Sequence, residues 1–365
     1  MPKMKLLVLA QTPPPVHGQS VMVRTLVAGL PGEGIDLEHV NLRLSRTSAD
    51  IGGWRPGKFL AVLDACFHAV TARFTQGCDT LYYVPAPGKR GALYRDWTVM
   101  LLCRPFFKRL VLHWHAPGLG DWLAHRATAL ERAVTRRLLG GADLSLVLGE
   151  NLRADAEALP ARTIRVVPNG VADPGPADRS ASRPADRPFD VLFLGLCCED
   201  KGLFDAAAAV LEANFRTGAV NFRLTAAGEF PDDTGARRYA VLARQNPGAI
   251  RHAGFAAASA KQALLRQSDC LCLPTRFPNE GQPLVVLEAM AADLPVVASR
   301  WRGIPAMLAP GASRLVPPEN VAALTEALLD LRRNPPPAGV ARAHFLENYT
   351  VEKHLRCLAT ALTGR

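Results

Sequence analysis

Short runs of large apolar residues alternate along the chain with longer stretches rich in Ala, Leu and Arg. The apolar runs show no regular polar alternation, which is typical of parallel strands that helices cover on both faces. The pattern therefore predicts an α/β protein. The predicted strands of the first half are Lys5–Ala10, Thr80–Val84, Arg109–His113, Leu144–Leu148 and Ile164–Val167, and those of the second half are Asp190–Leu194, Asn221–Ala226, Cys270–Leu273 and Pro295–Ala298.

A segment with almost no large apolar side chain separates the two groups of strands. Residues 173–188 contain four prolines and cannot contribute to a core, so they are interpreted as a linker. The chain of 365 residues is about twice the length of a usual single domain. We therefore expect two doubly wound, Rossmann-like domains, residues 1–172 and residues 189–349. Ligands are expected at the carboxyl ends of the strands, in a cleft between the domains.

Composition narrows the class of protein. The chain is 48% hydrophobic and 21% charged, which excludes wholesale disorder. Its apolar runs are shorter than the roughly 18 residues that a membrane-spanning helix needs. The apolar run that follows Met1–Lys5 is too short for a signal peptide, so we expect a cytoplasmic protein. The eight cysteines have no Cys-x-x-Cys spacing, and we expect reduced, mostly buried thiols.

Positive charge is concentrated in the first half of the chain. Residues 1–170 hold 21 Lys and Arg against 13 Asp and Glu, whereas residues 171–365 hold 22 against 20. The formal net charge is +10, so an anionic partner is expected to meet the first half. Nucleic acid is a weak candidate, because no recognised nucleic-acid module accompanies the charge.

The most informative segment runs from Leu273 to Ala292. Pro283 is a favourable first-turn residue, which predicts a helix from there to about Ala292. Glu288 is the only charge in this apolar helix and therefore needs a partner. That partner is either a distant cation of the protein or the vicinal hydroxyls of a ribose or sugar. Glu280 precedes the same helix beside Gly281, which favours the second interpretation.

A second segment joins a strand to a helix at the place where α/β proteins commonly bind a diphosphate. Lys201 and Gly202 fall in this loop, after the strand Asp190–Leu194. A loop lysine by itself is usually a solvated surface group. The segment contains neither a Gly-x-Gly-x-x-Gly motif nor a Walker phosphate loop, which argues against a dinucleotide dehydrogenase or an NTPase.

Taken in order, these motifs resemble the retaining glycosyltransferases of family 4, which have the GT-B fold of two Rossmann-like domains. The glutamates eight positions apart carry the most specific part of the resemblance. One matching segment, Pro168–Val171, ends the first domain, and those of the second domain are Phe193–Gly195, Lys201–Gly202, Ala227–Glu229, His252–Phe255, Glu280 and Glu288. Those of the first half are Pro13–Ser20, His113–Ala116 and Leu148–Arg153.

The resemblance implies transfer of a sugar from a nucleotide diphosphate sugar to an acceptor, with retention at the anomeric carbon. It implies that Glu288 binds the ribose and that His115, Glu280 and Lys201 form the catalytic group, at the sugar and the diphosphate. Neither a cofactor nor a metal is expected, because the sequence lacks the Asp-x-Asp of metal-using transferases. No protein nucleophile is nominated. The remaining donor-binding residues implied are Gly281, Gln282, Gly202, Gly18, Gly254 and Phe255.

Two positions depart from the family pattern. Leu196 stands where family members carry an arginine, five residues before the diphosphate lysine. Arg276, four residues before Glu280, is the candidate that would replace its charge. The glycine loop has Gly18 alone where a Gly-Gly pair is common, which leaves its role in phosphate binding open.

Two histidines end a predicted strand of the first half. Alternation places His113 and His115 on the same side of the strand, a spacing that would also suit zinc. No third ligand can be named, so zinc is disfavoured. His113 is interpreted as a core residue, and His115 as a residue of the cleft.

The stretch from Lys89 to Arg109 combines basic residues with aromatic ones. It can be a helix packed on the sheet with basic residues at its ends. Alternatively, it can be a patch that settles on anionic lipid, which would suit a lipid-linked acceptor and a place on the inner face of the cell membrane. The residues assigned to this patch are Lys89, Arg90, Arg95, Trp97, Arg104, Lys108 and Arg109.

The leading hypothesis is a retaining, metal-independent GT-B glycosyltransferase with a glycan or lipid-linked acceptor. The alternatives are a sugar-nucleotide epimerase or hydrolase of the same fold, and a nucleotide-sugar-binding protein without catalysis. A final helix within residues 350–365 is expected to pack on the first domain, as in that family. Uridine, guanosine and adenosine donors all remain open.

Overall fold

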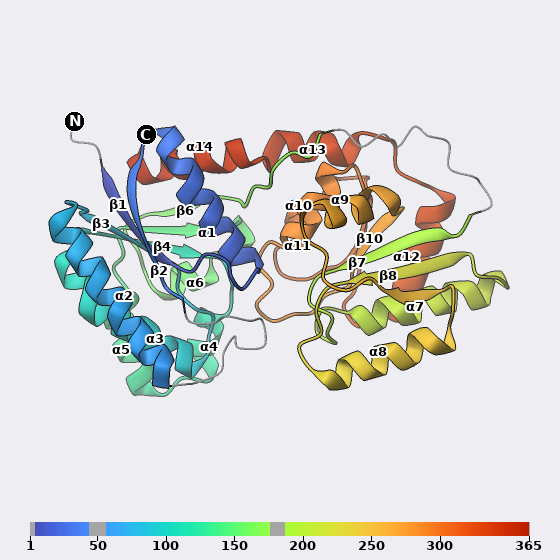
Figure 1. Cartoon of the computed structure of the whole chain (residues 1–365), viewed down its shortest axis with the longest axis horizontal. Helices are drawn as coiled ribbons and strands as arrows, with labels where there is room; N and C mark the ends of the chain where they lie inside the picture. The colour runs from blue at the N-terminus through green and yellow to red at the C-terminus, as the bar shows by residue number, and fades with distance from the viewer. Residues whose placement is uncertain (1–3, 44–55, 176–186, 365) are drawn as a thin grey trace. The chain divides into compact units, whose positions relative to one another are not determined.

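The computed structural model describes residues 4–43, 56–175 and 187–364 (Figure 1). The chain divides into two compact units, and each is described by itself. The first unit comprises Met1–Gly170 and Val351–Arg365, and the second comprises Val171–Thr350. Of the predicted linker 173–188, residues 176–186 lie outside the described residues.

The first unit is built on a parallel sheet of six strands in the order β2-β1-β3-β4-β5-β6. Its strands are β1 Lys5–Ala10, β2 Asp36–Asn41, β3 Thr80–Tyr83, β4 Arg109–Trp114, β5 Leu144–Val147 and β6 Ile164–Val166. Its helices are α1 Gly18–Gly29, α2 Pro56–Thr75, α3 Arg90–Cys103, α4 Leu119–His125, α5 Ala129–Leu139, α6 Ala154–Ala158 and α14 Val351–Thr363. Short 3₁₀ turns are η1 Leu30–Glu33, η3 Arg104–Phe106 and η4 Glu150–Leu152.

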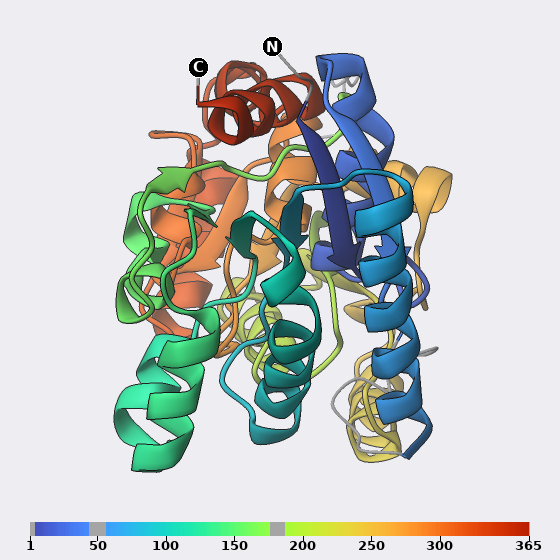
Figure 2. The same ribbon diagram turned by 90° about the vertical axis from the view of Figure 1, so that its left-hand side faces the viewer.

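Alternation along the strands gives this sheet two apolar faces. Leu7 and Leu9 of β1 belong to a core with α2 and α3, whereas Leu6 and Val8 belong to a core with α1 and α14. Successive side chains of a strand point to opposite faces, so an unbroken apolar run is needed to bury both. In Figure 2 the blue α2, the teal α3 and the green α5 form one layer of helices.

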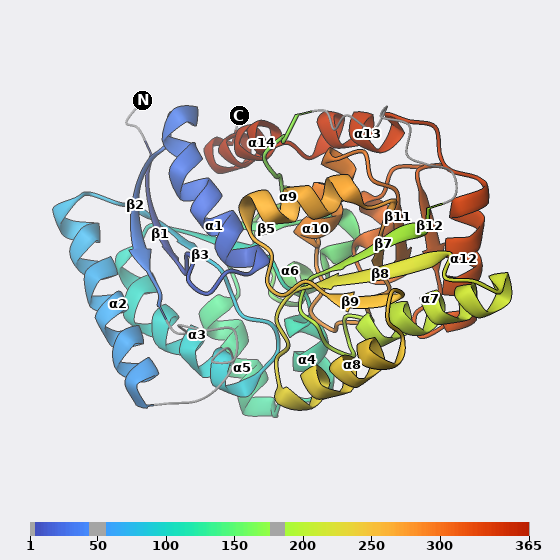
Figure 3. The same cartoon turned by 45° about the vertical axis from the view of Figure 1, so that its right-hand side comes forward.

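The second unit repeats this architecture with the strand order β12-β11-β10-β7-β8-β9, again wholly parallel. Its strands are β7 Phe189–Leu194, β8 Phe222–Ala227, β9 Ile250–His252, β10 Cys270–Leu273, β11 Val296–Ser299 and β12 Ser313–Val316. Its helices are α7 Leu203–Thr217, α8 Asp233–Gln245, α9 Ala258–Gln267, α10 Leu284–Ala291, α11 Ile304–Met307, α12 Val321–Arg333 and α13 Val340–Asn348. Figure 3 brings this unit forward.

The predicted fold class is confirmed, and all nine predicted strands are present within one or two residues of the expected bounds. The sequence missed β2, β9 and β12, each of which is an edge strand of its sheet. All eight cysteines are free thiols, six of them buried, as expected. Among the described residues, no helix has both the length and the apolar composition needed to cross a bilayer.

Candidate functional site

The candidate site of the second unit lies where its strand order reverses. The first strand of this sheet, β7, pairs with β10 on one side and with β8 on the other. At such a point the loops that follow two neighbouring strands diverge and leave room for a ligand. The loop 195–202 follows β7 and the loop 274–283 follows β10. Their backbones meet, since Arg276 N–H donates to the carbonyl of Asp200 at 2.7 Å.

Two glycines allow the backbones at this edge to approach closely. Gly202 has φ of +79° and caps the start of α7, and a Cβ there would lie 2.3 Å from the carbonyl oxygen of Pro274. Gly228, after β8, has φ of +153°, and a Cβ there would lie 1.7 Å from the carbonyl oxygen of Gly195. Both positions therefore require glycine for conformation and for space.

The two loops bring Lys201 and Glu280 together, as neighbouring loops at one sheet edge can. Lys201 Nζ lies 2.6 Å from Glu280 Oε2, and both side chains are largely buried. The same oxygen accepts a hydrogen bond from Thr275 Oγ1 at 3.1 Å. Lys201 Nζ also lies 4.8 Å from the centre of the Phe277 ring. This carboxylate and this ammonium face one another beside the amino end of α7.

Glu288, in the second turn of α10, also has a lysine partner. Its Oε1 accepts a hydrogen bond from Lys261 Nζ of α9, and the two helices lie next to one another in Figure 3. Its other oxygen, Oε2, is buried without a hydrogen-bond partner among the described residues. Burial raises the pKa of Glu288, and Lys261 opposes that rise. Of the two kinds of partner considered for Glu288, the protein cation is present. One oxygen of the carboxylate, Oε2, still has no hydrogen-bond donor among the described residues.

Arg276 is held by the protein's own acids. Its guanidinium lies 3.0 Å from Asp205, 3.3 Å from Glu319 and 3.7 Å from Glu199. Three carboxylates around one arginine leave it little charge to offer a diphosphate. The geometry favours a structural role for Arg276 over the predicted replacement of the arginine missing at Leu196.

The other predicted donor-binding residues of this unit surround the same edge. Gly281 and Gln282 lie between Glu280 and the start of α10. Gly254, with φ of +72°, and Phe255 follow β9 and precede α9. The Phe255 side chain is 54% exposed, so its ring is available to a planar ligand.

In the first unit, four histidines gather around the carboxyl end of β4. His113 and His115 have ring centres 4.0 Å apart, and Tyr82 Oη is hydrogen-bonded to His113 Nδ1. Burial lowers the pKa of His113 well below its ordinary value and that of His115 to about 3, and the nearby His354 adds to both shifts. The Nε2 atoms of His113, His115 and His354 are buried and have no hydrogen-bond partner among the described residues. The cluster is therefore neutral at physiological pH.

His17 and Gly18 open α1 after the loop that follows β1. His17 is the N-cap, because its Nδ1 accepts from Ser20 N–H at 3.3 Å and its own N–H donates to Ser20 Oγ at 3.1 Å. Gly18 is the first residue of the helix. Burial lowers the pKa of His17, and this residue contributes to the lowered pKa of His115. The glycine loop and the His-bearing strand end thus lie at the same edge of the first sheet.

The basic stretch 89–109 is mostly engaged in the fold. Arg90 pairs with Glu131 at 2.9 Å, and Arg95 pairs with the buried Asp96 at 2.6 Å. Trp97 Nε1 donates to Thr135, Arg104 to the carbonyls that end α5, and Arg109 to the carbonyl of Leu362. Lys89 is the N-cap residue of α3, and Lys108 is exposed after η3. The first interpretation, a helix packed on the sheet, therefore fits this stretch better than a lipid-facing helix.

A protein-family model matches most of the second unit. Residues 188–334 match the family model of glycosyl transferases group 1. This part of the chain is therefore similar to group 1 glycosyltransferases. The match covers the loops that carry Lys201 and Glu280 and the helix that carries Glu288, so the resemblance predicted from these motifs is confirmed for this part of the chain.

Curated proteins match parts of the chain. A Salmonella typhimurium protein whose name assigns it to colanic acid biosynthesis as a glycosyltransferase is 30% identical over 162 residues, 42% of this chain and 38% of that protein. Glycogen synthase from Mycobacterium tuberculosis is 31% identical over 203 residues, 54% of this chain and 47% of that enzyme. The chain thus spans less than half the length of the curated relatives it matches.

Solved structures match nearly the whole chain and confirm the GT-B fold. Sucrose-phosphate synthase from Thermosynechococcus elongatus superposes with a TM-score of 0.75 at 17% identity, over 99% of both chains. HepE from Anabaena, solved in complex with UDP-glucose, superposes with a TM-score of 0.70 at 17% identity, over 99% of this chain and 100% of that one.

Sequence reasoning missed the partners that hold the predicted residues. Lys261 was not nominated, because a lysine on a helix gives no sign in the sequence that it reaches a glutamate 27 positions later. Thr275 was missed because a threonine in a loop gives no sign in the sequence of the oxygen to which its hydroxyl will donate. His17 and His354 come from distant segments, and only the folded first unit shows that they surround His115.

Proposed function

We propose that the protein is a retaining, metal-independent glycosyltransferase that moves a sugar from a nucleotide diphosphate donor to a glycan or lipid-linked acceptor. The coarse assignment rests on the match to group 1 glycosyltransferases and on the GT-B fold. Donor, stereochemistry and acceptor are the proposed part. The complexes of HepE with UDP and with UDP-glucose support a nucleotide sugar as the donor.

The observation that carries the proposal is the half-satisfied carboxylate of Glu288. A buried carboxylate oxygen without a hydrogen-bond donor destabilises the folded protein, by about 1 to 3 kcal/mol. Vicinal ribose hydroxyls supply two donors with the spacing of a carboxylate. Lys261 opposes the rise in the pKa of Glu288 and holds its other oxygen by a hydrogen bond. We infer that Glu288 accepts hydrogen bonds from the ribose of the donor.

Lys201 and the amino end of α7 are the groups proposed to meet the diphosphate. A nucleoside diphosphate gains negative charge as it leaves the sugar, so the site must stabilise that charge in the transition state. An ammonium and the free N–H groups at a helix start do this without a metal. In the structure Glu280 forms an ion pair with Lys201. When the diphosphate takes over Lys201, Glu280 becomes available to the hydroxyls of the donor sugar.

The acceptor step needs no nucleophile from the protein. The acceptor hydroxyl attacks the anomeric carbon on the face from which the diphosphate departs, and the departing phosphate oxygen takes its proton. His115 is proposed to contact the transferred sugar with an uncharged ring, consistent with its low pKa. A neutral imidazole can donate or accept a hydrogen bond without competing with the diphosphate for charge.

A binding experiment tests the donor assignment. Thermal unfolding is followed with UDP, GDP, ADP and their sugars, because a ligand that binds the folded state raises the transition in proportion to its affinity. Glu288→Gln is expected to weaken the best nucleotide about tenfold or more. Glu326→Gln, on the exposed side of α12, is the matched control and should bind as the wild type does. Equal affinity in Glu288→Gln and wild type would refute the ribose role.

Product analysis tests the chemistry. With donor and a panel of acceptor sugars, NMR of the anomeric proton should show the donor's configuration in the product, and EDTA should leave the rate unchanged. Free sugar or an epimer formed without acceptor would instead identify a hydrolase or epimerase. Tight donor binding without turnover would identify a binding protein, consistent with Leu196 in place of an arginine.

A further inference from the structure

A short loop with two arginines and a tryptophan follows β11, at the carboxyl edge of the second sheet. Arg300, Trp301 and Arg302 are consecutive, and both arginines are exposed. The chain has no acidic residue between Asp293 and Glu319, so the positive charge of this segment has no acid next to it in the sequence. The segment is called the Arg300–Arg302 loop.

The Arg300–Arg302 loop is attached to the loop that carries Glu280. Strands β10 and β11 pair in the sheet, so the loops that follow them are neighbours. Trp301 Nε1 donates a hydrogen bond to the carbonyl oxygen of Phe277 at 2.8 Å. Ser299 Oγ donates to the carbonyl oxygen of Thr275, whose own hydroxyl donates to Glu280. The Arg300–Arg302 loop is therefore held beside the groups proposed to bind the donor sugar.

Strand order places this loop next to the sugar end of the proposed donor. Lys201, proposed for the diphosphate, follows β7, and Glu280, proposed for the donor sugar, follows β10. The next strand in the same direction is β11. The sites proposed for the diphosphate and the donor sugar and the Arg300–Arg302 loop thus follow one another along the sheet edge. A molecule that meets this loop and also approaches the donor sugar takes the place of an acceptor.

Arg302 stands at a position where the backbone favours glycine. Of the described residues other than glycine, three have a positive φ: Asp293, Arg302 and Glu319, at 53°, 47° and 58°. The Asp293 carboxylate accepts hydrogen bonds from N–H groups at the start of α13, and Glu319 pairs with Arg276, so both side chains stabilise the fold. The Arg302 guanidinium lies 5.5 Å from the centre of the Trp301 ring and is exposed. Backbone strain is typical of functional sites, so strain at an exposed arginine points to a ligand.

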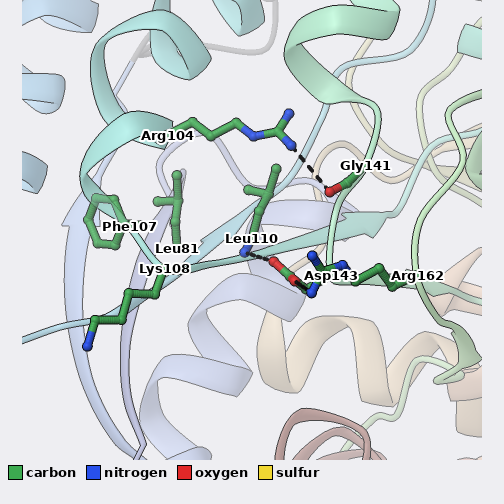
Figure 4. Close-up of a pocket in the computed structure, with 8 residues that line it drawn as sticks. All are labelled: Leu81, Arg104, Phe107, Lys108, Leu110, Gly141, Asp143 and Arg162. Carbon is green, nitrogen blue, oxygen red and sulfur yellow. Dashed lines mark hydrogen bonds and ion pairs between the residues drawn. The ribbon is translucent and has the colours of Figure 1, made fainter.

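The arginines of a basic pocket in the first unit provide a contrast. This pocket of about 230 Å³ is shown in Figure 4. Its Arg104 donates to backbone carbonyl oxygens, and its Arg162 pairs with Asp143. In the second unit three carboxylates surround Arg276. The guanidinium of Arg300 has no hydrogen-bond or ion-pair partner within the described residues, so its charge can meet a ligand.

We propose that the Arg300–Arg302 loop binds an anionic group, a phosphate or a carboxylate, on the acceptor sugar. This inference rests on the proposed transfer from a nucleotide sugar and adds the charge of the acceptor to it. Guanidinium groups bind phosphate and carboxylate through paired, charge-assisted hydrogen bonds. Trp301 supports the guanidinium of Arg302 with its ring, and its hydrogen bond to Phe277 ties it to the loop of the donor site. The loop thus selects the acceptor by its charge.

Binding of sugars to the nucleotide-loaded protein tests the proposal. The full chain is saturated with whichever of UDP, GDP and ADP raises its thermal transition most, so that the diphosphate site is filled. Glucose, glucose 6-phosphate and glucuronic acid are then titrated by calorimetry. At least one of the two anionic sugars should bind about tenfold more tightly than glucose, and this preference should weaken as salt is added.

Two variants separate sugar binding from folding. Arg302→Gly should reduce the preference for the anionic sugar about fivefold, and Arg300→Ala/Arg302→Gly should abolish it. Arg302→Gly should nevertheless unfold at a urea concentration no lower than the wild type, because glycine adopts a positive φ without strain. Arg333→Ala, which removes an exposed arginine at the end of α12, is the matched control and should keep the preference.

Four results would overturn the proposal. Equal binding of charged and uncharged sugars would remove the selection by charge. A preference that survives in Arg300→Ala/Arg302→Gly would place the anion at other cations. Inorganic phosphate that binds as tightly as glucose 6-phosphate would make the loop a site for free phosphate. Loss of stability in Arg302→Gly, with unchanged sugar binding, would give Arg302 a structural role.

The nucleotide titration keeps the donor assignment separate from this inference. Normal nucleotide binding without a preference for anionic sugars would refute the acceptor site alone. Conversely, an anionic sugar that binds through Arg300 and Arg302 to a protein that binds none of the nucleotides would refute the donor assignment alone.

Discussion

The His cluster of the first unit should make the protein sensitive to mild acid. His115 has a pKa of about 3 in the folded protein, whereas an unfolded histidine has its ordinary pKa of 6.5. The pKa values of His113, His354 and His17 are lowered as well, by burial above all. The unfolded chain therefore binds more protons than the folded one as the pH falls below 6.5. The stability from these groups is complete above that pH and is lost progressively below it.

The magnitude for His115 follows from its pKa. At about pH 5 the unfolded histidine is almost fully protonated while folded His115, with a pKa of about 3, remains neutral. The free energy of unfolding due to this residue is then about 2 kcal/mol lower than at about pH 7.5. His113 and His354 act in the same direction, so the wild type should lose more than this.

Urea unfolding of wild type and His115→Gln at the two pH values measures the effect. Fluorescence of Trp97, Trp114 and Trp122 reports on the first unit. The pH-dependent loss should be about 2 kcal/mol smaller in His115→Gln, because glutamine does not titrate. His68→Gln, on the exposed side of α2, should keep the wild-type loss. The same loss in His115→Gln as in wild type would refute the argument that His115 is held neutral by burial.

Three further predictions concern the second unit. Gly228→Ala should lower the free energy of unfolding of the second unit by about 3 kcal/mol, because alanine at this position would have a positive φ and would collide with the Gly195 carbonyl. Urea unfolding followed by the fluorescence of Trp301 measures the change. Wild-type stability would mean that the loop at Gly195 moves aside. Lys261→Met should raise the pKa of Glu288 further, because it removes the cation that opposes the effect of burial. The nucleotide affinity, measured by calorimetry, should weaken about tenfold and should fall further as the pH is lowered. An affinity that does not depend on pH would contradict the pairing of Glu288 with Lys261. Arg276→Ala should cost about 1 to 2 kcal/mol of stability and leave nucleotide affinity unchanged, whereas weaker nucleotide binding would restore its predicted role at the diphosphate.

The fold could be predicted because both sheets are parallel and covered on two faces. A strand such as Cys270–Leu273 must be apolar throughout, and this makes it visible in the sequence. The edge strand Asp36–Asn41 carries a polar sequence because one side of it has no neighbouring strand to bury it. The three strands that the sequence missed are therefore edge strands, although the edge strand β6 was predicted.

The site could be predicted only as far as its residues follow strands that pair in the sheet. Lys201, Gly202, Glu280 and Glu288 follow two strands that pair in the sheet, so their meeting is a consequence of topology. The residues next to a cation in the sequence do not show whether the fold will pair it with an acid. Arg276 was assigned to the donor because it is near Glu280 in the sequence, yet Asp205 and Glu319, which bind it, come from other elements.

Helix α14 has a consequence for how the chain is made. Leu355, Leu358 and Leu362 of this helix are part of the core beneath β1 and β4, although the whole second unit is synthesised before them. The first sheet therefore leaves the ribosome with one side covered by α1 alone, and nearly all of the remaining chain is translated before α14 closes that side. During this interval Leu6, Val8 and Val111 are exposed to chaperones and to aggregation, so a stop codon placed just before Val351 should yield an insoluble first half and a second half that folds by itself.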